Sequence, residues 1–561
     1  MKKILTLFLL IYTANLTAQN PYRSPLDIPL LLGANFGELR PNHFHSGIDL
    51  KTQGVINKPV YAMADGYISR ISVSPTGYGL ALYINYPATK QTGVYGHINK
   101  FAPKIAAYIK EKQYEKESYT IDISLNADEI PVKRGDMVAY SGNTGSSGGP
   151  HVHFEIRNTE NRTAIDALEY CKTDIEDTQA PLLKGIAVYP LNEKGAVDFS
   201  RDPYRRSVPV LKDGGYASLK DTAQVWGRIG VGVYANDKMT GTTNIYGVRK
   251  VRLFCDDKEI YSSDMSVVDF AKTRMINSLI DYDYWSRTKI FYQKSFIEPG
   301  NKLPIYKAVN NGYIDINEER IYNFRYELED LYGNKTTYPF CVEGREQTIP
   351  LKKRCFQTLL WNQDNGVLTD KFSLVVPKDY LYDNVCFTLK NNPSRNYLSD
   401  VFEVNDTHVP LHGFCDMSLK LNKDTLSNKA QYGIVHIVGS RERWVGGAYK
   451  NGYVTGRIGE LGNTYAVSVD TKAPTITPLQ PERWVRQSEI KIRLSDNKSG
   501  VAASKGTIDG AFVLFENDVK SSVYSYKFDP SRLKKGQSHQ FVFTATDACG
   551  NTASYEYSFK Y

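Results

Sequence analysis

Short runs of Val, Ile, Tyr and Phe, separated by turn residues at intervals of roughly ten positions, fill most of the chain after about residue 20. Side chains of these types, which include 40 tyrosines, suit the half-buried faces of β-strands. Long helical periodicity is nearly absent, and the best helix candidate is 103–116, which opens on Pro103. The pattern predicts an all-β fold with very little helix.

The first residues have the pattern of a secretory signal. Lys2 and Lys3 form a basic start, the apolar stretch 4–14 is too short to span a bilayer, and small residues offer cleavage near Ala18 or Gln19. The alternative is a buried or membrane-anchoring helix. No cysteine lies near the cleavage region, and no later stretch of the sequence is apolar enough to span a membrane. We therefore expect an exported protein, periplasmic or secreted, without a lipid anchor.

Charge and cysteine content narrow the classes of function. The net charge of +8 is spread along the chain, and no nucleic-acid-binding motif is present. Two interpretations of this charge stay open. It attracts an anionic surface such as a cell wall, or it is the ordinary surface charge of a soluble protein. The seven cysteines are odd in number and contain no Cys-x-x-Cys pair, which argues against a zinc finger or a redox motif. One or two disulfide bonds are expected at most, and their pairing is left open.

A weak internal repeat lies in the rest of the chain. The segment 177–181, Asp-Thr-Gln-Ala-Pro, recurs as Asp-Thr-Lys-Ala-Pro at 470–474. The turn 330–334, Asp-Leu-Tyr-Gly-Asn, recurs as Asp-Ala-Cys-Gly-Asn at 547–551, and both turns precede a last strand. Strand-rich units of this kind predict immunoglobulin-like sandwiches.

A third shared point lies between these motifs, where Asp237 with a later glycine parallels the turn 496–500. From opening to closing aspartate the first copy spans 153 residues and the second 77, so the first carries 76 extra residues on both sides of Asp237. The turn 496–500 offers oxygen ligands to calcium, but it has few acids, and a plain turn is the favoured interpretation.

Metal-capable side chains occur in two places near the start of the chain. His45 and Asp49 are four residues apart, and His151 and His153 follow later at spacing i, i+2. Alternate residues of a strand share one face, so His151 and His153 point the same way. Two imidazoles and one carboxylate suit zinc, and three protein ligands with one open position form a catalytic zinc site. We predict that His45, Asp49 and His153 bind zinc.

Two histidines remain for proton transfer. His151 shares the strand face of His153, and His97 ends another β-like segment. A neutral imidazole close to a metal site can accept a proton from water or hold an oxyanion.

These motifs form five ordered blocks within residues 33–157. They are 40–49, 60–68, 95–97, 132–136, and 141–145 together with 149–156. The blocks resemble the lysostaphin-type (LytM-like) zinc endopeptidases of peptidoglycan, a family marked by His-x-x-x-Asp early and His-x-His late. The resemblance implies a small antiparallel β-sheet domain that hydrolyses cell-wall cross-link peptides. It also implies that His45, Asp49 and His153 are the zinc ligands and that His97 and His151 are catalytic.

The expected organisation combines the repeat with this resemblance. The ranges are a signal peptide at 1–19, a zinc endopeptidase domain at 20–174, a β-sandwich with insertions at 175–345, a β-rich domain at 346–469 and an immunoglobulin-like sandwich at 470–561. Residues 101–130 are an insertion relative to a minimal family domain. They form either a solvated surface excursion or a wall of the substrate groove.

Several alternatives stay open. The chain is a peptidoglycan endopeptidase, a non-catalytic scaffold or activator of other wall hydrolases, or a secreted protease acting on glycine-rich proteins. Retention of all five histidine and aspartate positions favours the enzyme. The C-terminal β-domains bind a cell-wall or protein partner, cover the groove or serve as spacers.

Residues beside the motifs have open roles. His43 lies outside the ligand spacing and either supports the ligands or faces the substrate. Arg40 and Asn42 are substrate contacts or turn residues. Glu155, on the strand face of His151 and His153, is interpreted as a carboxylate that orients one of these imidazoles.

Overall fold

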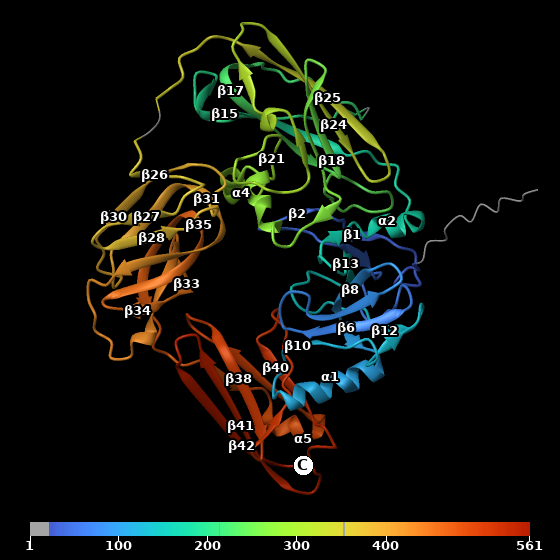
Figure 1. Ribbon diagram of the computed structural model, residues 1–561. Helices are drawn as coiled ribbons and strands as arrows, with labels where there is room; N and C mark the ends of the chain where they lie inside the picture. Colours follow the sequence, from blue (N-terminus) through green and yellow to red (C-terminus); the bar gives the residue numbers. More distant parts are fainter. Residues whose placement is uncertain (1–21, 213, 352–353) are drawn as a thin grey trace, which may run out of the picture.

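The computed structural model describes residues 22–212, 214–351 and 354–561. The predicted signal peptide, residues 1–19, lies outside the described residues. Antiparallel sheets dominate, which confirms the all-β prediction. Four large hydrophobic cores follow one another along the chain, and the units built around them are arranged in a ring (Figure 1). In the described part of the chain, no helix combines the length and apolarity needed to cross a bilayer.

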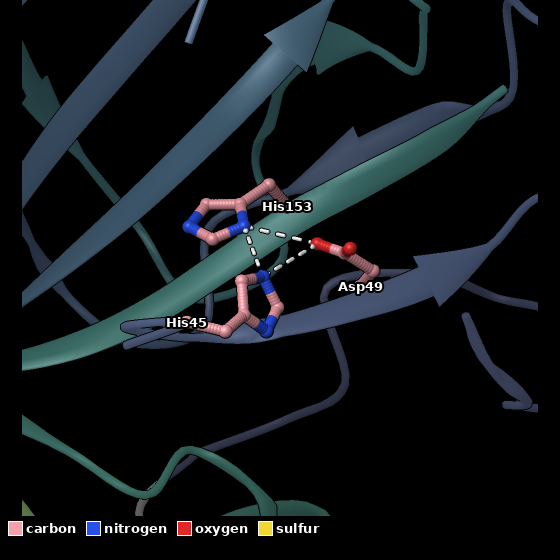
Figure 2. Close-up of side chains that lie close together, drawn as sticks. All are labelled: His45, Asp49 and His153. Atoms are coloured by element: carbon pink, nitrogen blue, oxygen red, sulfur yellow. Dashed lines mark hydrogen bonds and ion pairs between the residues drawn. The ribbon is translucent and has the colours of Figure 1, made fainter. Parts of the chain in front are cut away.

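The N-terminal unit is a β-sheet domain with one substantial helix. Its elements are β1 (Leu32–Ala34), β2 (Leu39–Arg40), β3 (His43–Phe44), β4 (Ile48–Lys51), β5 (Pro59–Tyr61), β6 (Gly66–Val73), β7 (Leu80–Tyr86), β8 (Gln91–Ile98), β9 (Lys100–Phe101), α1 (Pro103–Glu115), β10 (Ile121–Ser124), β11 (Pro131–Val132), β12 (Met137–Tyr140), β13 (His151–Asn158), β14 (Ala164–Ile165), α2 (Leu168–Cys171) and η1 (Lys172–Asp174). The main sheet has the order β1-β4-β13-β8-β7-β6-β10. Its neighbouring strands β4 and β13 carry two of the side chains drawn in Figure 2. The predicted helix at 103–116 is confirmed as α1.

The second unit is the enlarged copy of the repeat. Its elements are β15 (Leu182–Val197), β16 (Tyr204–Ser207), β17 (Ala223–Asn236), β18 (Lys250–Cys255), β19 (Lys258–Asp264), β20 (Val267–Val268), η2 (Thr273–Met275), α3 (Ile276–Leu279), α4 (Tyr282–Thr288), β21 (Gln293–Lys294), β22 (Tyr306–Ala308), η3 (Asn310–Gly312), β23 (Ile314–Ile316), β24 (Ile321–Glu329) and β25 (Lys335–Gly344).

Part of this unit's extra length packs on the N-terminal unit. Strand β20 pairs with β14, so one sheet continues across the boundary. Met239, Met265 and Trp285 belong to the same hydrophobic core as the N-terminal strands. Burial of large apolar side chains across the boundary ties the two units together.

The third unit is a β-rich body with one disulfide bond. Its elements are β26 (Gln357–Leu359), β27 (Asn365–Leu368), β28 (Phe372–Val376), β29 (Val385–Phe387), β30 (Leu389–Asn392), β31 (Val401–Lys420), η4 (Lys429–Gln431), β32 (Tyr432–Val438), β33 (Arg441–Gly446), β34 (Ala448–Lys450) and β35 (Tyr453–Val469). Cys355 and Cys386 are bonded beside the paired strands β26 and β29. The other five cysteines are free.

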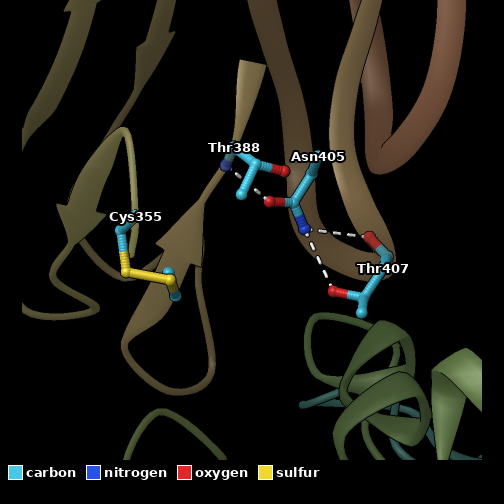
Figure 3. The surroundings of a disulfide bond; sticks show 5 residues. Cys355, Thr388, Asn405 and Thr407 are labelled. Atoms are coloured by element: carbon cyan, nitrogen blue, oxygen red, sulfur yellow. Dashed lines mark hydrogen bonds between the residues drawn. A yellow bond between two sulfur atoms is a disulfide. The ribbon is translucent and has the colours of Figure 1, made fainter. Parts of the chain in front are cut away.

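A bulge interrupts the long strand β31 near this disulfide (Figure 3). Asn405 has a φ of 73°, and its side chain accepts a hydrogen bond from the Thr388 amide at 3.1 Å. Its amide group donates to the carbonyl oxygen and hydroxyl of Thr407 at 2.9 and 3.1 Å. Asparagine tolerates this left-handed backbone, and its side chain satisfies the groups that the bulge unpairs.

The fourth unit has two sheets around one core. Its elements are β36 (Thr475–Pro478), η5 (Pro481–Arg483), α5 (Trp484–Gln487), β37 (Glu489–Ser495), β38 (Val501–Ile508), β39 (Ala511–Val513), β40 (Val523–Lys527), β41 (Ser538–Asp547) and β42 (Thr552–Lys560). The sheets β36-β37-β40 and β39-β38-β41-β42 both contribute to the core around Trp484. The assignment of this unit as immunoglobulin-like stays a prediction.

The fourth unit closes the ring by packing on the insertion of the N-terminal unit (Figure 1). Lys110 forms an ion pair with Asp529 at 2.8 Å, and Arg532 lies 3.6 Å above the ring of Tyr114. Lys110 is itself 52% exposed and most charged residues of α1 face solvent, so the insertion is a surface segment that also contacts the fourth unit. Both interpretations of residues 101–130 stay predictions.

Candidate metal centre

The main sheet brings the predicted ligands together. Asp49 on β4 and His153 on β13 are directly opposite each other in the antiparallel pair, and His45 lies just before β4. His45 Nε2 lies 3.1 Å from both Asp49 Oδ1 and His153 Nδ1, and the last two atoms are 3.0 Å apart. Figure 2 shows these three side chains pointing toward one another.

Hydrogen bonds behind the centre determine the tautomer of His45. Its Nδ1 lies 2.7 Å from the carbonyl oxygen of Asn35. A carbonyl oxygen only accepts hydrogen bonds, so Nδ1 carries the proton. Nε2 of the neutral ring therefore presents a lone pair to Asp49 and His153.

Glu155 determines the tautomer of His153 in the same way. The carboxylate accepts from His153 Nε2 at 2.8 Å, from Ser46 Oγ at 2.7 Å and from Tyr78 Oη at 2.5 Å. Burial raises the pKa of Glu155, but the nearby Arg157 and His153 outweigh it and hold the pKa well below its usual range. The predicted orienting role of Glu155 is confirmed for its contact with His153.

The three facing atoms fit a zinc ion. Two neutral imidazole nitrogens and one carboxylate oxygen, all lone-pair donors, converge within 3.1 Å of one another. Lone pairs this close repel unless a proton or a cation lies among them. Without a metal, the carboxylates of Asp49 and Glu155 outweigh the burial that lowers the pKa of His153 and raise it to about 9. This donor set suits zinc. Without the metal, a proton on His153 takes the place of the cation among the three atoms.

His97 lies beside this centre in a strained backbone conformation. It has a φ of 57° within a bulge of β8, where an extra residue opposes β7. Its Nδ1 donates to the carbonyl oxygen of Thr144 at 2.8 Å, which leaves a lone pair on Nε2. Burial, together with His153 and His151, lowers the pKa of His97 to about 3, so the ring is neutral at physiological pH.

His151 completes the group. Its Nδ1 donates to the carbonyl oxygen of Gly149 at 2.8 Å, and its buried Nε2 has no hydrogen-bond partner. That atom lies 3.4 Å from Asp49 Oδ1, and the ring centroid is 4.8 Å from that of His97. The structure thus brings together all five side chains selected from the sequence.

Two side chains of the centre keep partial exposure to solvent. The side chains of Asp49 and His151 remain 16% and 15% exposed, whereas that of His153 is 4% exposed. The glycine-rich loop before β13 contacts His97 and His151 through the carbonyls of Thr144 and Gly149, and the fourth unit contacts this loop. Asp518 accepts a hydrogen bond from the amide of Gly145 at 2.8 Å, and Lys520 donates to the Gly145 carbonyl at 2.5 Å.

The flanking residues have separate positions. His43 is exposed, and its Nδ1 donates to the Pro41 carbonyl at 2.9 Å. Arg40 pairs with Glu38 at 3.1 Å. Asn42 accepts a hydrogen bond from Asn277 at 2.9 Å, which makes it a contact between units.

Sequence reasoning missed the groups that hold the imidazoles. The acceptors of His45, His97 and His151 are backbone carbonyls, which carry no side-chain signal. Tyr78 was also missed; its ring stacks on His153 at a centroid distance of 5.0 Å. A tyrosine at a turn before β7 has no spacing that would single it out.

Comparison with known proteins gives a curated relative of part of the chain. It is 32% identical over 121 residues and is described as an uncharacterized metalloprotease of Haemophilus influenzae. The aligned segment makes up 21% of this chain and 19% of that protein, so the chain spans about a fifth of the relative's length. A separate family match, described as a Zu5-like domain, covers residues 356–470.

Solved structures include similar domains. The catalytic domain of the M23 protein EnpA from Enterococcus faecalis is 25% identical, with a TM-score of 0.17, over 23% of this chain and 82% of that one. The catalytic domain of lysostaphin from Staphylococcus simulans is 21% identical, with a TM-score of 0.20, over 26% and 92%. The motifs within residues 33–157 carry the resemblance to lysostaphin-type peptidases, and the description of the curated relative as a metalloprotease agrees with it.

Proposed function

We propose that this protein is a zinc-dependent endopeptidase that hydrolyses the peptide cross-links of peptidoglycan. The observation that carries the proposal is the convergence of three lone-pair atoms from His45, Asp49 and His153 within 3.1 Å. His97 and His151, each with an acceptor nitrogen, lie at the edge of the same cluster. A histidine that is merely buried in a hydrophobic core does not need such a cluster, because each of its ring nitrogens can have its own hydrogen-bond partner.

Zinc, when bound by these three residues, supplies Lewis acidity toward a carbonyl oxygen and toward water. The chain's own residues supply proton transfer. Nε2 of His151 and Nε2 of His97 are both acceptors in the resting tautomers, so either can take a proton from the attacking water. The histidine that takes it becomes a donor and can return the proton to the leaving amine nitrogen or hold the oxyanion.

The resting tautomers also indicate which of the two histidines accepts the proton first and which stabilises the oxyanion. Because Nδ1 of His97 is bound to the Thr144 carbonyl, His97 can stabilise an oxyanion only after it gains a proton at Nε2. Nε2 of His151 has no hydrogen-bond partner and lies 3.4 Å from Asp49 Oδ1, so it is free to accept a proton beside the proposed ligands. We therefore assign the first proton to His151.

The substrate class is supported by resemblance and by the N-terminal sequence. A lysostaphin-like domain on a chain with a secretory pattern would meet cell-wall peptides in the periplasm or outside the cell. We propose the boundaries 20–174, 175–345, 346–469 and 470–561 for the four domains, with 1–19 as the signal peptide. The C-terminal β-domains would position the catalytic domain on the wall or on a partner.

Digestion of purified sacculi tests this proposal. The protein is depleted of metal, reloaded with zinc and incubated with sacculi, and the released muropeptides are separated. The expected result is loss of cross-linked dimers with the native chain and no loss with His153→Ala. The matched control is His436→Ala, a histidine of the third unit, which should behave like the native chain.

Three outcomes separate the alternatives. No cleavage of sacculi or of glycine-rich peptides by the zinc-loaded native chain contradicts the enzyme and leaves a scaffold. Cleavage of glycine-rich peptides alone redirects the substrate to proteins. Cleavage of sacculi that persists in His153→Ala contradicts the assigned metal ligands.

A further inference from the structure

Three aspartates of the repeated motifs meet in each copy of the repeat. Asp177, Asp237 and Asp330 form the first triad, and each offers a carboxylate oxygen within 4.8 Å of the other two. The second triad meets the same limit and consists of Asp470, Asp496 and Asp547. The motifs are far apart in sequence, so the fold is what gathers them.

The first triad is buried without a basic partner. Asp177, Asp237 and Asp330 are 7%, 4% and 3% exposed. In the parts of the chain that the structure describes, none of the three forms an ion pair with a basic side chain. Oδ2 of Asp177 is buried and has no hydrogen-bond partner at all. Buried carboxylates this close together require a compensating cation or proton.

The same hydrogen bonds hold both triads. Asn334 donates from its backbone to Asp330 at 2.9 Å, and its side chain donates to Asp330 at 2.7 Å and to the Asp177 carbonyl at 3.2 Å. Asn551 makes the matching three bonds in the second triad at 2.8, 2.7 and 3.2 Å. Oδ1 of Asp496 is also buried without a partner there. The two copies of the repeat therefore share a three-dimensional arrangement of these residues as well as a sequence pattern.

We propose that the first triad binds a calcium ion and that the second triad, built on the same framework, binds another. The side-chain donors are all oxygens, which hard cations prefer, and the triads contain none of the nitrogen or sulfur donors that favour zinc. Calcium accepts roughly six to eight oxygens in flexible geometry, so carbonyls and water can complete a site made from three carboxylates.

The competing interpretation is a proton. Burial and the carboxylates of Asp330 and Asp177 raise the pKa of Asp237 to about 8. A protonated Asp237 would remove one charge and leave the triad without any need for metal. The two interpretations differ in whether calcium stabilises the fold.

Calcium at the first triad would act on the metal centre through one loop. Asp237 and Tyr246 exchange backbone hydrogen bonds at 2.8 and 3.0 Å, which closes the loop between them. The next residue, Gly247, exchanges two hydrogen bonds with the side chain of Asn35 at 2.8 and 2.9 Å. The carbonyl of Asn35 is the acceptor that orients His45. A cation that orders this loop therefore supports the His45 tautomer.

Calcium-dependent melting of the full-length chain tests the proposal. The His153→Ala chain is the parent, because it lacks a zinc ligand and its response reports on the triads alone. After chelator treatment, about 2 mM calcium chloride should raise the melting temperature by about 5 °C or more. Asp237→Asn should remove one part of the calcium-induced rise in melting temperature, and Asp496→Asn should remove the other part. The double variant should show no rise.

The asparagine variants carry an internal check on folding. Without calcium, Asp237→Asn should melt at or above the temperature of its parent, because a neutral amide avoids the cost of burying this carboxyl group in its charged form. Asp128→Asn, which removes an exposed carboxylate, should keep the full calcium response. No calcium shift in the parent, or a shift that persists in the double variant, would overturn the proposal. An equal shift with magnesium chloride would overturn the assignment to calcium.

Discussion

The metal centre and the two aspartate triads gather cation-binding groups by different means. At the centre, imidazoles of His45 and His153 are aligned by acceptors behind them, and the side chain of Asp49 is 16% exposed. In the triads, backbone amides and an asparagine hold carboxylates alone, and the first triad is closed from solvent. The difference in exposure agrees with the two proposals, a centre that meets substrate and triads that stabilise the fold.

The largest expected effect comes from removing the same charge in the two kinds of site. Asp49→Asn takes away the carboxylate that faces both His45 and His153, whereas Asp237→Asn leaves the centre intact. We expect Asp49→Asn to lose bound zinc and to lower sacculus hydrolysis by more than about 100-fold, the upper range for groups that only orient a ligand. Zinc per chain and muropeptide release measure this. Equal losses in both variants would break the comparison.

The next effect concerns the carboxylate behind the metal centre. Glu155→Gln keeps the shape of the side chain but weakens its acceptance from His153 Nε2 and leaves Arg157 without its ionic partner. We expect zinc affinity to fall by about 10- to 100-fold. A competitive zinc titration measures it, with Glu160→Gln, an exposed carboxylate, as the control. Unchanged affinity would show that the tautomer of His153 needs no carboxylate.

The pH dependence should be opposite in the metal-free and zinc-bound forms. A His153 pKa raised to about 9 stabilises the metal-free fold below its unfolded pKa of about 6.5, and this stabilisation is lost as the pH rises through about 9. Zinc needs the same nitrogen without its proton. Its affinity should therefore rise by about tenfold per pH unit across this window. Melting and zinc titration at several pH values test both trends, and a flat zinc affinity would contradict them.

The smallest effect lies outside both kinds of site. Lys110 pairs with Asp529 at the contact between α1 and the fourth unit, and its side chain is 52% exposed. Solvent screens such a pair, so Lys110→Ala should change the free energy of unfolding by less than about 1 kcal/mol. Chemical denaturation measures this change. Altered zinc or calcium binding in the same variant would mean that the contact and the sites are coupled.

Much of the candidate site could be predicted because side chains form it, and their types and spacing can be read in the sequence. The spacing of His151 and His153 places both on one strand face, and both reach Asp49 in the structure. Helix α1 was also predicted, since a proline start and periodic apolar residues are local signals. The all-β class followed from composition in the same way.

Other features could not be predicted because they depend on contacts between distant segments. The insertion around α1 has a charged sequence typical of a solvated surface, yet its side chains meet Asp529 and Arg532 more than 400 residues later. The calcium interpretation was disfavoured at 496–500, because one turn has too few acids. Only the fold adds Asp470 and Asp547 to Asp496.

The amino-acid sequence alone determined which donors this protein carries and their order along the chain. Tertiary structure decided which nitrogen of each histidine presents a lone pair, because the acceptors are carbonyls of Asn35, Thr144 and Gly149 and the carboxylate of Glu155. It also decided that carboxylates from separate motifs share one pocket. Local propensities act over a few residues, whereas these arrangements require strands to pair and loops to pack across the whole chain.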